Sequence, residues 1–232
     1  MPGKPLADIG GVPMIVQVWR RACEADVGPV VVACAEQEIV DAVTSAGGLA
    51  VLTRSDHPSG SDRIHEALGI VAQDAGRIIN LQGDLPTIDP ADIQRLSDSL
   101  AAAPPEVDIV TLVTEIRSDA EGADPNVVKA VVAFTDSAET GRALYFSRLP
   151  VPGGDSLRYH HIGLYAYRRE ALTRFVELPP SPLEKSERLE QLRALEAGMT
   201  ILARRVDTIP LGVDTPAQLA EARRILSIKS DK

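Results

Sequence analysis

The chain has 232 residues, which is long enough for a sizeable core, but aromatic residues make up only 3% of it. The core must therefore be built from Val, Ile, Leu and Ala, as in the layers of an α/β domain. The formal net charge of −9 at pH 7 argues against nucleic acid as a partner, although a metal ion could still bridge carboxylates to the phosphates of a nucleotide. No apolar stretch is long enough to cross a membrane and no signal peptide is visible, so we expect a cytoplasmic protein with no membrane partner.

Hydrophobic periodicity predicts regularly alternating helices and strands in the first half of the chain. Residues 1–6 are expected to form a loop, and Pro13 then opens a helix with Met14, Ile15, Val18 and Trp19 on one face. Strands are expected at 29–34, 49–53 and 77–81, and further helices at 36–46, 64–73 and 90–102. This alternation is typical of a doubly wound, mostly parallel sheet.

The pattern changes after Pro104 and Pro105, where long polar loops separate the apolar segments. Strands are expected at 107–115, 127–134, 142–147, 160–167 and 201–206, and helices at 169–177, 183–197 and 215–228. We expect a mixed sheet here, part of which forms a smaller subdomain. Residues 1–232 would then make up a single domain with two halves, 1–105 and 106–232.

Cys23 and Cys34 are the two cysteines, and each lies in an apolar segment, which indicates buried free thiols in a reducing compartment. The chain has only four histidines, with no Cys or Glu at ligand spacing. A zinc site is therefore not expected.

The apolar run that contains Ile78, Ile79 and Leu81 stops at Gln82-Gly83-Asp84. Ligands of open α/β sheets bind just beyond the carboxyl ends of the strands, so Asp84 is well placed to hold a metal ion. The alternative is an ordinary Asx-type turn with a solvated Asp84.

Two further charged residues are candidates for the same site. Asp214 directly precedes a helix, and two carboxylates that converge on one magnesium ion would suit phosphoryl or nucleotidyl transfer. Its alternative role is to cap that helix, since Thr215 and Pro216 follow it. Lys4 lies in a loop and could reach phosphates, or it could simply be solvated.

The polar segment 53–63 precedes the next expected helix and is rich in serine, arginine and glycine. Backbone amides, hydroxyls and guanidinium groups of such a segment can hold a nucleotide. The alternative is an ordinary N-cap loop.

The second half contains three more groups of candidates. Arg148 ends an aromatic strand and could bind a substrate carboxylate, or could lie exposed on the surface. His160 and His161 offer neutral hydrogen-bond donors. Residues 187–193 combine charges with a leucine stripe, a pattern that also fits i,i+3 charge pairs on a solvated helix face.

Several of these motifs occur together and in a fixed order: P-G-K-P-L at 2–6, D-H-P-S-G-S-D-R at 56–63, Q-G-D-L-P at 82–86, Y-F-S-R at 145–148, H-H-I-G-L-Y-A-Y-R at 160–168, E-R-L-E-Q-L-R at 187–193 and G-V-D-T-P at 212–216. The chain closely resembles the 3-deoxy-manno-octulosonate cytidylyltransferases of lipopolysaccharide biosynthesis, nearly from end to end. The resemblance implies a Rossmann-like nucleotidyltransferase fold, a homodimer, and magnesium-dependent transfer of CMP from CTP to 3-deoxy-D-manno-octulosonate (KDO). The first half would bind the nucleotide, and the second half would bind the sugar and form the dimer.

The resemblance also implies a role for individual residues. Asp84 and Asp214 would bind magnesium, and Lys4 would contact the triphosphate. The residues expected to hold the nucleotide are Ser59, Gly60, Ser61 and Arg63. The residues expected to line the KDO pocket are Gln82, Arg148, His161, Tyr165, Glu190 and Gln191.

One departure from the family pattern concerns the first strand. In the family, a strand and an arginine-containing phosphate loop precede the P-G-K motif, and neither is present in this sequence. We therefore expect that the true coding start lies upstream of Met1. Two alternatives remain: another sugar or cofactor nucleotidyltransferase of the same fold, or a non-catalytic nucleotide-binding relative.

Overall fold

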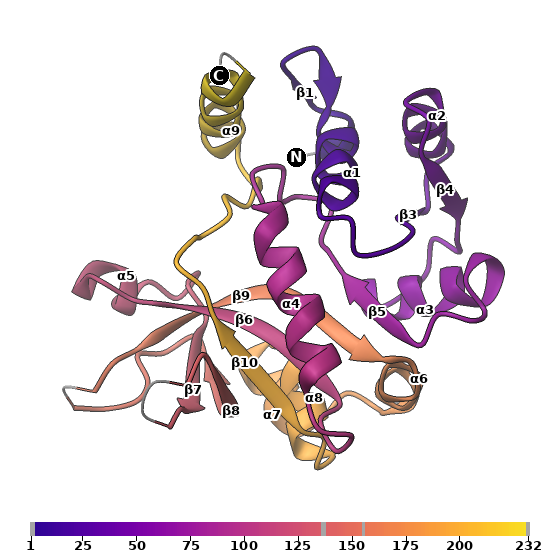
Figure 1. The fold of residues 1–232 in the computed structure, drawn as a ribbon. Helices are drawn as coiled ribbons and strands as arrows, with labels where there is room; N and C mark the ends of the chain where they lie inside the picture. Colours follow the sequence, from indigo (N-terminus) through magenta and orange to yellow (C-terminus); the bar gives the residue numbers. More distant parts are fainter. Residues whose placement is uncertain (1–2, 136–137, 155, 231–232) are drawn as a thin grey trace. The chain divides into compact units, whose positions relative to one another are not determined.

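The computed structural model describes residues 3–135, 138–154 and 156–230 (Figure 1). The chain divides into two compact units: one contains Met1–Ala75, Leu81–Gln94 and Ile209–Lys232, and the other contains Gly76–Asn80 and Arg95–Thr208. These units differ from the predicted halves 1–105 and 106–232, because the last helix returns to the first unit. Met1 and Pro2 of the predicted N-terminal loop lie outside the described residues.

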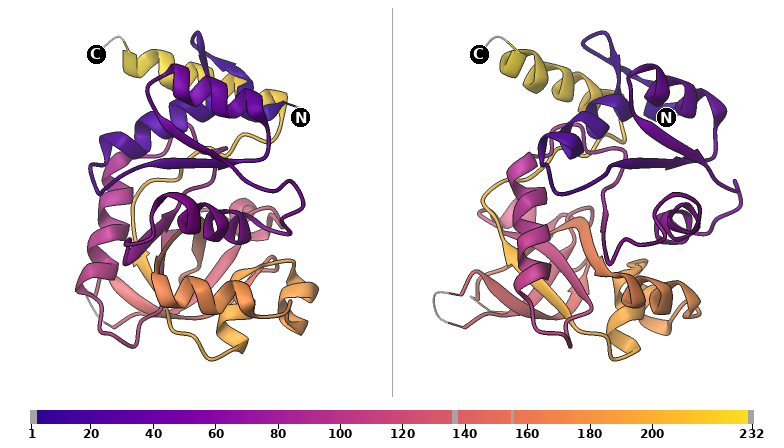
Figure 2. Two further views of the ribbon diagram at one scale, coloured as in Figure 1. Left: turned by 90° about the vertical axis from the view of Figure 1, so that its right-hand side faces the viewer. Right: turned by 45° about the vertical axis from the view of Figure 1, so that its right-hand side comes forward.

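The first unit begins with a short 3-10 helix, η1 (Lys4–Leu6), and a hairpin of β1 (Asp8–Ile9) and β2 (Val12–Pro13). The hairpin was not predicted, although Gly10 and Gly11 carry its signal. Both have positive φ angles, 64° and 80°, as a tight turn between antiparallel strands requires. Ile9 is buried against the C-terminal helix α9 (Pro216–Ser230), which lies beside the hairpin in both views of Figure 2.

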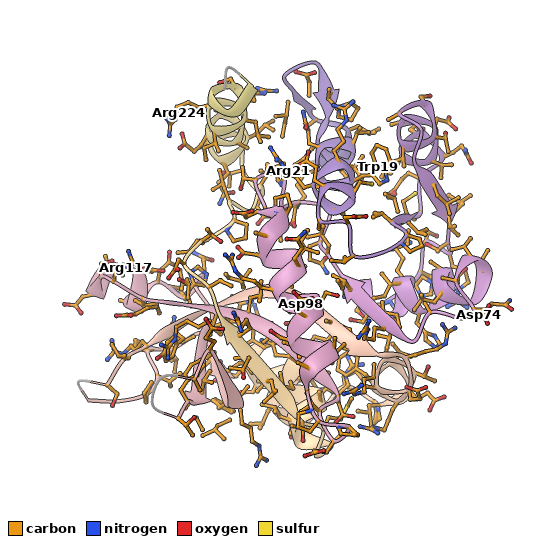
Figure 3. The ribbon with its side chains drawn as sticks, in the orientation of Figure 1. Trp19, Arg21, Asp74, Asp98, Arg117 and Arg224 are labelled. Atoms are coloured by element: carbon orange, nitrogen blue, oxygen red, sulfur yellow. The ribbon has the colours of Figure 1, made fainter. Side chains whose placement is uncertain are left out.

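The predicted helix and strand order is confirmed through this unit: α1 (Met14–Glu24), β3 (Val31–Cys34), α2 (Gln37–Ser45) and β4 (Leu49–Leu52), with β3 and β4 parallel. Ile15, Val16 and Val43 form the core between the helices and the strands. Trp19 points from α1 toward α2 (Figure 3) and packs against the same core. Cys34 is buried as expected, but Cys23 is exposed, because burial fades along α1 and its last turn faces solvent.

The next helix, α3 (Gly60–Val71), begins four residues before the predicted start at residue 64. Ser59 is its N-cap: its hydroxyl oxygen accepts a hydrogen bond from the amide of Asp62 at 3.3 Å. The polar residues 60–63, predicted to be a loop, therefore form the first turn of the helix, where their side chains need not be apolar.

The second unit is built on a six-stranded mixed sheet in the order β5-β9-β6-β10-β8-β7. Its strands are β5 (Arg77–Asn80), β6 (Ile109–Glu115), β7 (Lys129–Ala133), β8 (Thr140–Ser147), β9 (Tyr159–Arg168) and β10 (Ile201–Arg205). The mixed sheet predicted for the second half is confirmed, since β6 and β10 are the only parallel pair of this sheet in the described part of the chain. The strand at 77–81 was expected in the parallel sheet of the first half, and that prediction is wrong, because β5 pairs antiparallel with β9. The long strand β9 lies between β5 and β6 and runs antiparallel to both of them. β7 and β8 are also antiparallel neighbours.

The helices of the second unit are α5 (Asp119–Ala123), α6 (Arg169–Glu177), α7 (Pro182–Glu187) and α8 (Gln191–Glu196), while α4 (Pro90–Ala102) starts in the first unit and ends in the second. The prediction of one helix at 183–197 is wrong, because α7 and α8 are separate. Arg188 ends α7 in the left-handed conformation, with φ 56°. In the part of the chain that the structure describes, no helix combines the length and the apolarity that a membrane span needs.

Candidate active site

The two loops that carry Asp84 and Asp214 meet in the first unit. The amide of Val213 donates a hydrogen bond of 3.0 Å to the carbonyl oxygen of Asp84. Thr215, not Asp214, caps α9: its hydroxyl accepts a hydrogen bond from the amide of Gln218 at 3.3 Å, while the Gln218 side chain accepts from the amides of Asp214 and Thr215. The carboxylate of Asp214 is therefore not needed for capping and is available to a ligand.

Lys4 lies between the two carboxylates. Its Nζ is 3.0 Å from Oδ2 of Asp84 and 2.9 Å from Oδ1 of Asp214. Partial burial lowers the pKa of Lys4, but the hydrogen bonds to Asp214 and Asp84 outweigh it and leave the pKa above its ordinary value. The structure thus brings the three predicted catalytic residues together, and neither the solvated lysine nor the isolated Asx turn describes this arrangement.

A magnesium ion fits this pair of carboxylates only with help from other ligands. Among the described residues, no group of three His, Cys, Asp or Glu side chains gathers at one point. Magnesium is commonly held by one or two carboxylates together with waters and substrate phosphates. Asp84 and Asp214 already direct one oxygen each at a single cation, the Lys4 ammonium, and so provide that minimal set.

The predicted nucleotide-binding residues lie at the start of α3. Ser59 caps the helix and also donates a hydrogen bond of 2.6 Å to Asp62. Ser61 is buried. The guanidinium of Arg63 donates to the hydroxyl of Thr53 at 2.7 Å and to a neighbouring carbonyl, so this side chain braces the segment.

Gln82 lies beside Gly60, at a distance that would be an ordinary contact for a side chain there. A Cβ atom on Gly60 would lie 3.5 Å from the Gln82 side-chain amide nitrogen. Gln82 therefore lies beside the predicted nucleotide-binding segment in the first unit, whereas the other residues expected to line the KDO pocket belong to the second unit.

A pocket of about 450 Å³ adjoins this segment, and most of the residues that line it belong to the predicted segment 53–63. Its lining residues are Arg54, His57, Pro58, Asp62, His65 and Glu66. His57 is hydrogen-bonded through Nε2 to Glu66, and this bond is the main reason why the pKa of Glu66 lies below its ordinary value. Of the lining residues, sequence reasoning missed His65 and Glu66, which follow the D-H-P-S-G-S-D-R motif within α3.

In the second unit, Arg148 follows β8 and is partly buried, which excludes the alternative of a fully exposed arginine. Its Nε donates to the carbonyl oxygen of Glu187 at 3.2 Å, and its Nη1 donates to that of Pro125 at 3.1 Å. Backbone carbonyls thus hold the guanidinium without neutralising its charge.

His161 and Tyr165 project from β9, and their ring centres are 5.5 Å apart. His161 is buried, shares a hydrogen bond of 2.9 Å with the hydroxyl of Thr111, and has its pKa lowered to about 3 by burial. Burial also raises the pKa of Tyr165, to which the charges of Tyr167 and Glu190 add. Both side chains are therefore neutral hydrogen-bonding groups at physiological pH.

Glu190 and Gln191 lie at the start of α8, and Gln191 is buried. The alternative of a solvated charged helix face does not hold, because Arg193 is also buried. Its guanidinium forms a two-point contact with the carboxylate of Glu184, at 2.8 and 2.6 Å.

Comparisons with known proteins agree with these motifs. The family model described as cytidylyltransferase matches residues 1–201. A 3-deoxy-manno-octulosonate cytidylyltransferase of Paramagnetospirillum magneticum is 58% identical over 229 residues, which cover 97% of this chain and 92% of the relative. The protein of the same name from Parvibaculum lavamentivorans is 60% identical over 232 residues, covering 99% of this chain and 89% of the relative.

Solved structures show the same similarity. A structure of CMP:2-keto-3-deoxy-manno-octonic acid synthetase complexed with CTP has a TM-score of 0.91 and 41% identity, covering 99% of this chain and 93% of that one. A 4-diphosphocytidyl-2C-methyl-D-erythritol synthase from Anaerococcus prevotii has a TM-score of 0.65 at 11% identity, covering 96% of this chain and 93% of the other, and this likeness concerns the fold alone.

Proposed function

Because the chain belongs to the cytidylyltransferase family, we propose that it transfers CMP from CTP to KDO. The observation that carries the proposal is the convergence of Asp84 and Asp214 on Lys4, which gathers two carboxylates and an ammonium at one point. This combination suits the charge of a nucleoside triphosphate and of the metal ion that accompanies it.

In the proposed reaction, the anomeric hydroxyl oxygen of KDO forms a bond to the α-phosphorus of CTP. The bond from that phosphorus to the oxygen bridging to the β-phosphate breaks, and pyrophosphate leaves with the electron pair. The hydroxyl proton is released, and the second product is CMP-KDO. No side chain acts as a covalent nucleophile, so the protein contributes positioning and charge stabilisation.

Asp84 and Asp214 would hold magnesium, which neutralises phosphate charge when it is bound. Lys4 would contact the triphosphate, and the segment of Ser59, Gly60, Ser61 and Arg63 would hold the nucleotide. The geometry supports a bracing role for Arg63 and a capping role for Ser59 within this segment.

KDO carries one carboxylate and several hydroxyl groups. Arg148 would bind the carboxylate through its unneutralised guanidinium. Neutral His161 and Tyr165, together with Glu190 and Gln191, would bind hydroxyls. Gln82 would contact the sugar from its position beside Gly60.

Further features of the family belong to the same proposal. The parallel pair β3 and β4, joined through α2, supports a doubly wound sheet in the nucleotide-binding half. A homodimer would cover exposed leucines such as Leu144 and Leu149, which are 52% and 68% exposed. The two free cysteines are compatible with the cytoplasm.

The test is pyrophosphate release from CTP and KDO with magnesium, with CMP-KDO identified by mass. We expect release that depends on both substrates and on the metal. Turnover with another base or another sugar acid, but not with CTP and KDO, would replace the proposed substrates. The non-catalytic alternative would be favoured if the folded protein binds CTP but releases no pyrophosphate.

A further inference from the structure

Lys129 is a charged residue to which the proposed reaction assigns no role, and it is completely buried, with 0% of its surface exposed. It opens β7, which lies beside β8 (Figure 1), and it faces Ser147 across that pair. Its ammonium donates three hydrogen bonds, to the carbonyl oxygens of Asp124, Val127 and Arg148 at 2.9, 2.6 and 2.5 Å. An ammonium has three protons, and each of them therefore has an acceptor.

Burying a lysine is costly, because its charge loses water. Burial accordingly lowers the pKa of Lys129, against the charge of Asp124. A methionine of similar length could fill the same space without this cost. Unlike a methionine, the ammonium of Lys129 makes three hydrogen bonds to carbonyl oxygens, and one of them fixes the backbone of Arg148.

Glu187, the last residue of α7, is a second residue that contacts Arg148. Its carboxylate accepts hydrogen bonds from the hydroxyl of Tyr145 at 3.3 Å, the hydroxyl of Ser147 at 2.9 Å and the amide of Arg148 at 3.1 Å. Its backbone carbonyl accepts from Nε of Arg148 at 3.2 Å.

Arg148 is thus fixed at its amide, its carbonyl and two of its side-chain nitrogens, the second being Nη1 with Pro125. A guanidinium has five N–H groups, and these contacts use two of them. Among the described residues, Nη2 of Arg148 makes no hydrogen bond. The N–H groups of Nη2, together with the remaining N–H of Nη1, are therefore available to a ligand with a planar pair of acceptor oxygens, such as a carboxylate.

We propose that Lys129 and Glu187 are positioning residues that fix Arg148 in the orientation that binds the carboxylate of the sugar acid. This inference rests on the proposed function, which assigns that carboxylate to Arg148. If the two residues only joined the ends of β7, β8 and α7, their loss should lower stability without changing the KM for KDO selectively.

The test is a double-mutant cycle on KDO affinity, measured both as KM and by calorimetric titration. Arg148→Ala, Glu187→Ala and Lys129→Met should each raise the KM for KDO about tenfold or more, while the KM for CTP stays within about twofold. Residues that act through Arg148 are not additive with it. The double variant Arg148→Ala/Glu187→Ala should therefore bind KDO no more weakly than Arg148→Ala alone.

Ile109→Ala is the matched control, since it removes a buried side chain from β6 of the same sheet without touching Arg148. It should lower the melting temperature without changing the KM for KDO. If Lys129→Met does not fold, the double-mutant cycle of Arg148→Ala and Glu187→Ala alone distinguishes a positioning role from a structural role. Additive effects, or equal losses for KDO and CTP, would overturn the positioning role and leave the proposed function intact. An unchanged KM for KDO in Arg148→Ala would refute the assignment of Arg148 as well, and absence of KDO binding by the unmodified protein would refute the proposed function itself.

Discussion

The amide of Val213 donates a 3.0 Å hydrogen bond to the carbonyl oxygen of Asp84. This backbone contact joins two loops that are far apart in the sequence, and it places the neighbouring Asp214 beside Asp84. Because backbone atoms make the bond, the loops should stay together when the carboxylates themselves are changed. Substitutions of these carboxylates can therefore test their chemistry separately from the fold.

Asp84→Asn should lower kcat/KM about a hundredfold or more, since it removes one of two charges at the proposed metal site. The contact of Asp84 with Lys4 is partly exposed, so its loss should cost at most about 1 kcal/mol of stability. Pyrophosphate release and thermal unfolding measure the two effects.

The control for this variant is Asp98→Asn, which changes an exposed carboxylate on α4 (Figure 3) in the same way. It should leave both activity and stability unchanged. If Asp84→Asn were as active as the control, Asp84 would not be a metal ligand.

Lys4→Met should tighten the binding of manganese, a spectroscopic substitute for magnesium, when no nucleotide is present. The Lys4 ammonium and a metal ion compete for the same oxygens of Asp84 and Asp214, so removing the ammonium should improve affinity about three- to tenfold. Electron paramagnetic resonance of free manganese measures this directly. Weaker binding in the variant would show that Lys4 does not compete with the metal.

His161 should make the protein less stable as the pH falls. Its pKa is about 3 in the folded state because of burial, against an ordinary value of 6.5, so protons bind the unfolded state preferentially. The contribution of neutral His161 is complete above pH 6.5, and it is lost by about 1.4 kcal/mol per pH unit below that value, down to about pH 3.

His161→Gln keeps a neutral hydrogen-bonding side chain that does not titrate. Urea unfolding at pH 7.5 and at pH 5 should show a smaller loss of stability in the variant than in the unmodified protein. Equal losses in both proteins would mean that His161 is accessible to protons in the folded state.

Glu184 should stabilise the second unit at neutral pH and not in acid. The hydrogen bond from Arg193 is the main reason why the pKa of Glu184 lies below its ordinary value of 4.5. Its contribution is therefore present above pH 4.5, and it is lost as the pH falls through the lower folded-state pKa. Glu184→Gln should cost about 1–3 kcal/mol at pH 7.

The cost of Glu184→Gln should shrink as the pH falls below 4.5 and should be smallest below the lowered folded-state pKa, where the carboxylate of the unmodified protein is protonated as well. Denaturant unfolding across this range measures the difference. A cost that stays constant down to the acid limit would assign the effect to packing instead of charge.

Local patterns alone were sufficient for most of the helices and strands. The apolar face with Met14 and Val18, the valine-rich strand that ends at Cys34, and Pro90 at the start of α4 are signals that act over a few residues. The strand that ends near Leu81 and the carboxylate after it were visible for the same reason. The ordered motifs were also sufficient to indicate the family.

Tertiary structure decided what depends on contacts between distant segments. Strand direction is one case: β9 pairs with β5, β6 and β7, and no local pattern shows that it runs antiparallel to all of them. The break between α7 and α8 is another, because the left-handed Arg188 lies inside a continuous helical pattern.

The candidate site shows the same division. The sequence by itself determined which residue types were available, namely Lys4, Asp84 and Asp214, because charged side chains at the ends of elements can be read directly. The hydrogen bond between Val213 and Asp84 brings the two loops together, so that the Lys4 ammonium contacts both carboxylates. The pairing of β7 with β8 places the buried Lys129 ammonium at the carbonyl oxygen of Arg148. Contacts of this kind depend on the folded path of the backbone, which local sequence does not specify.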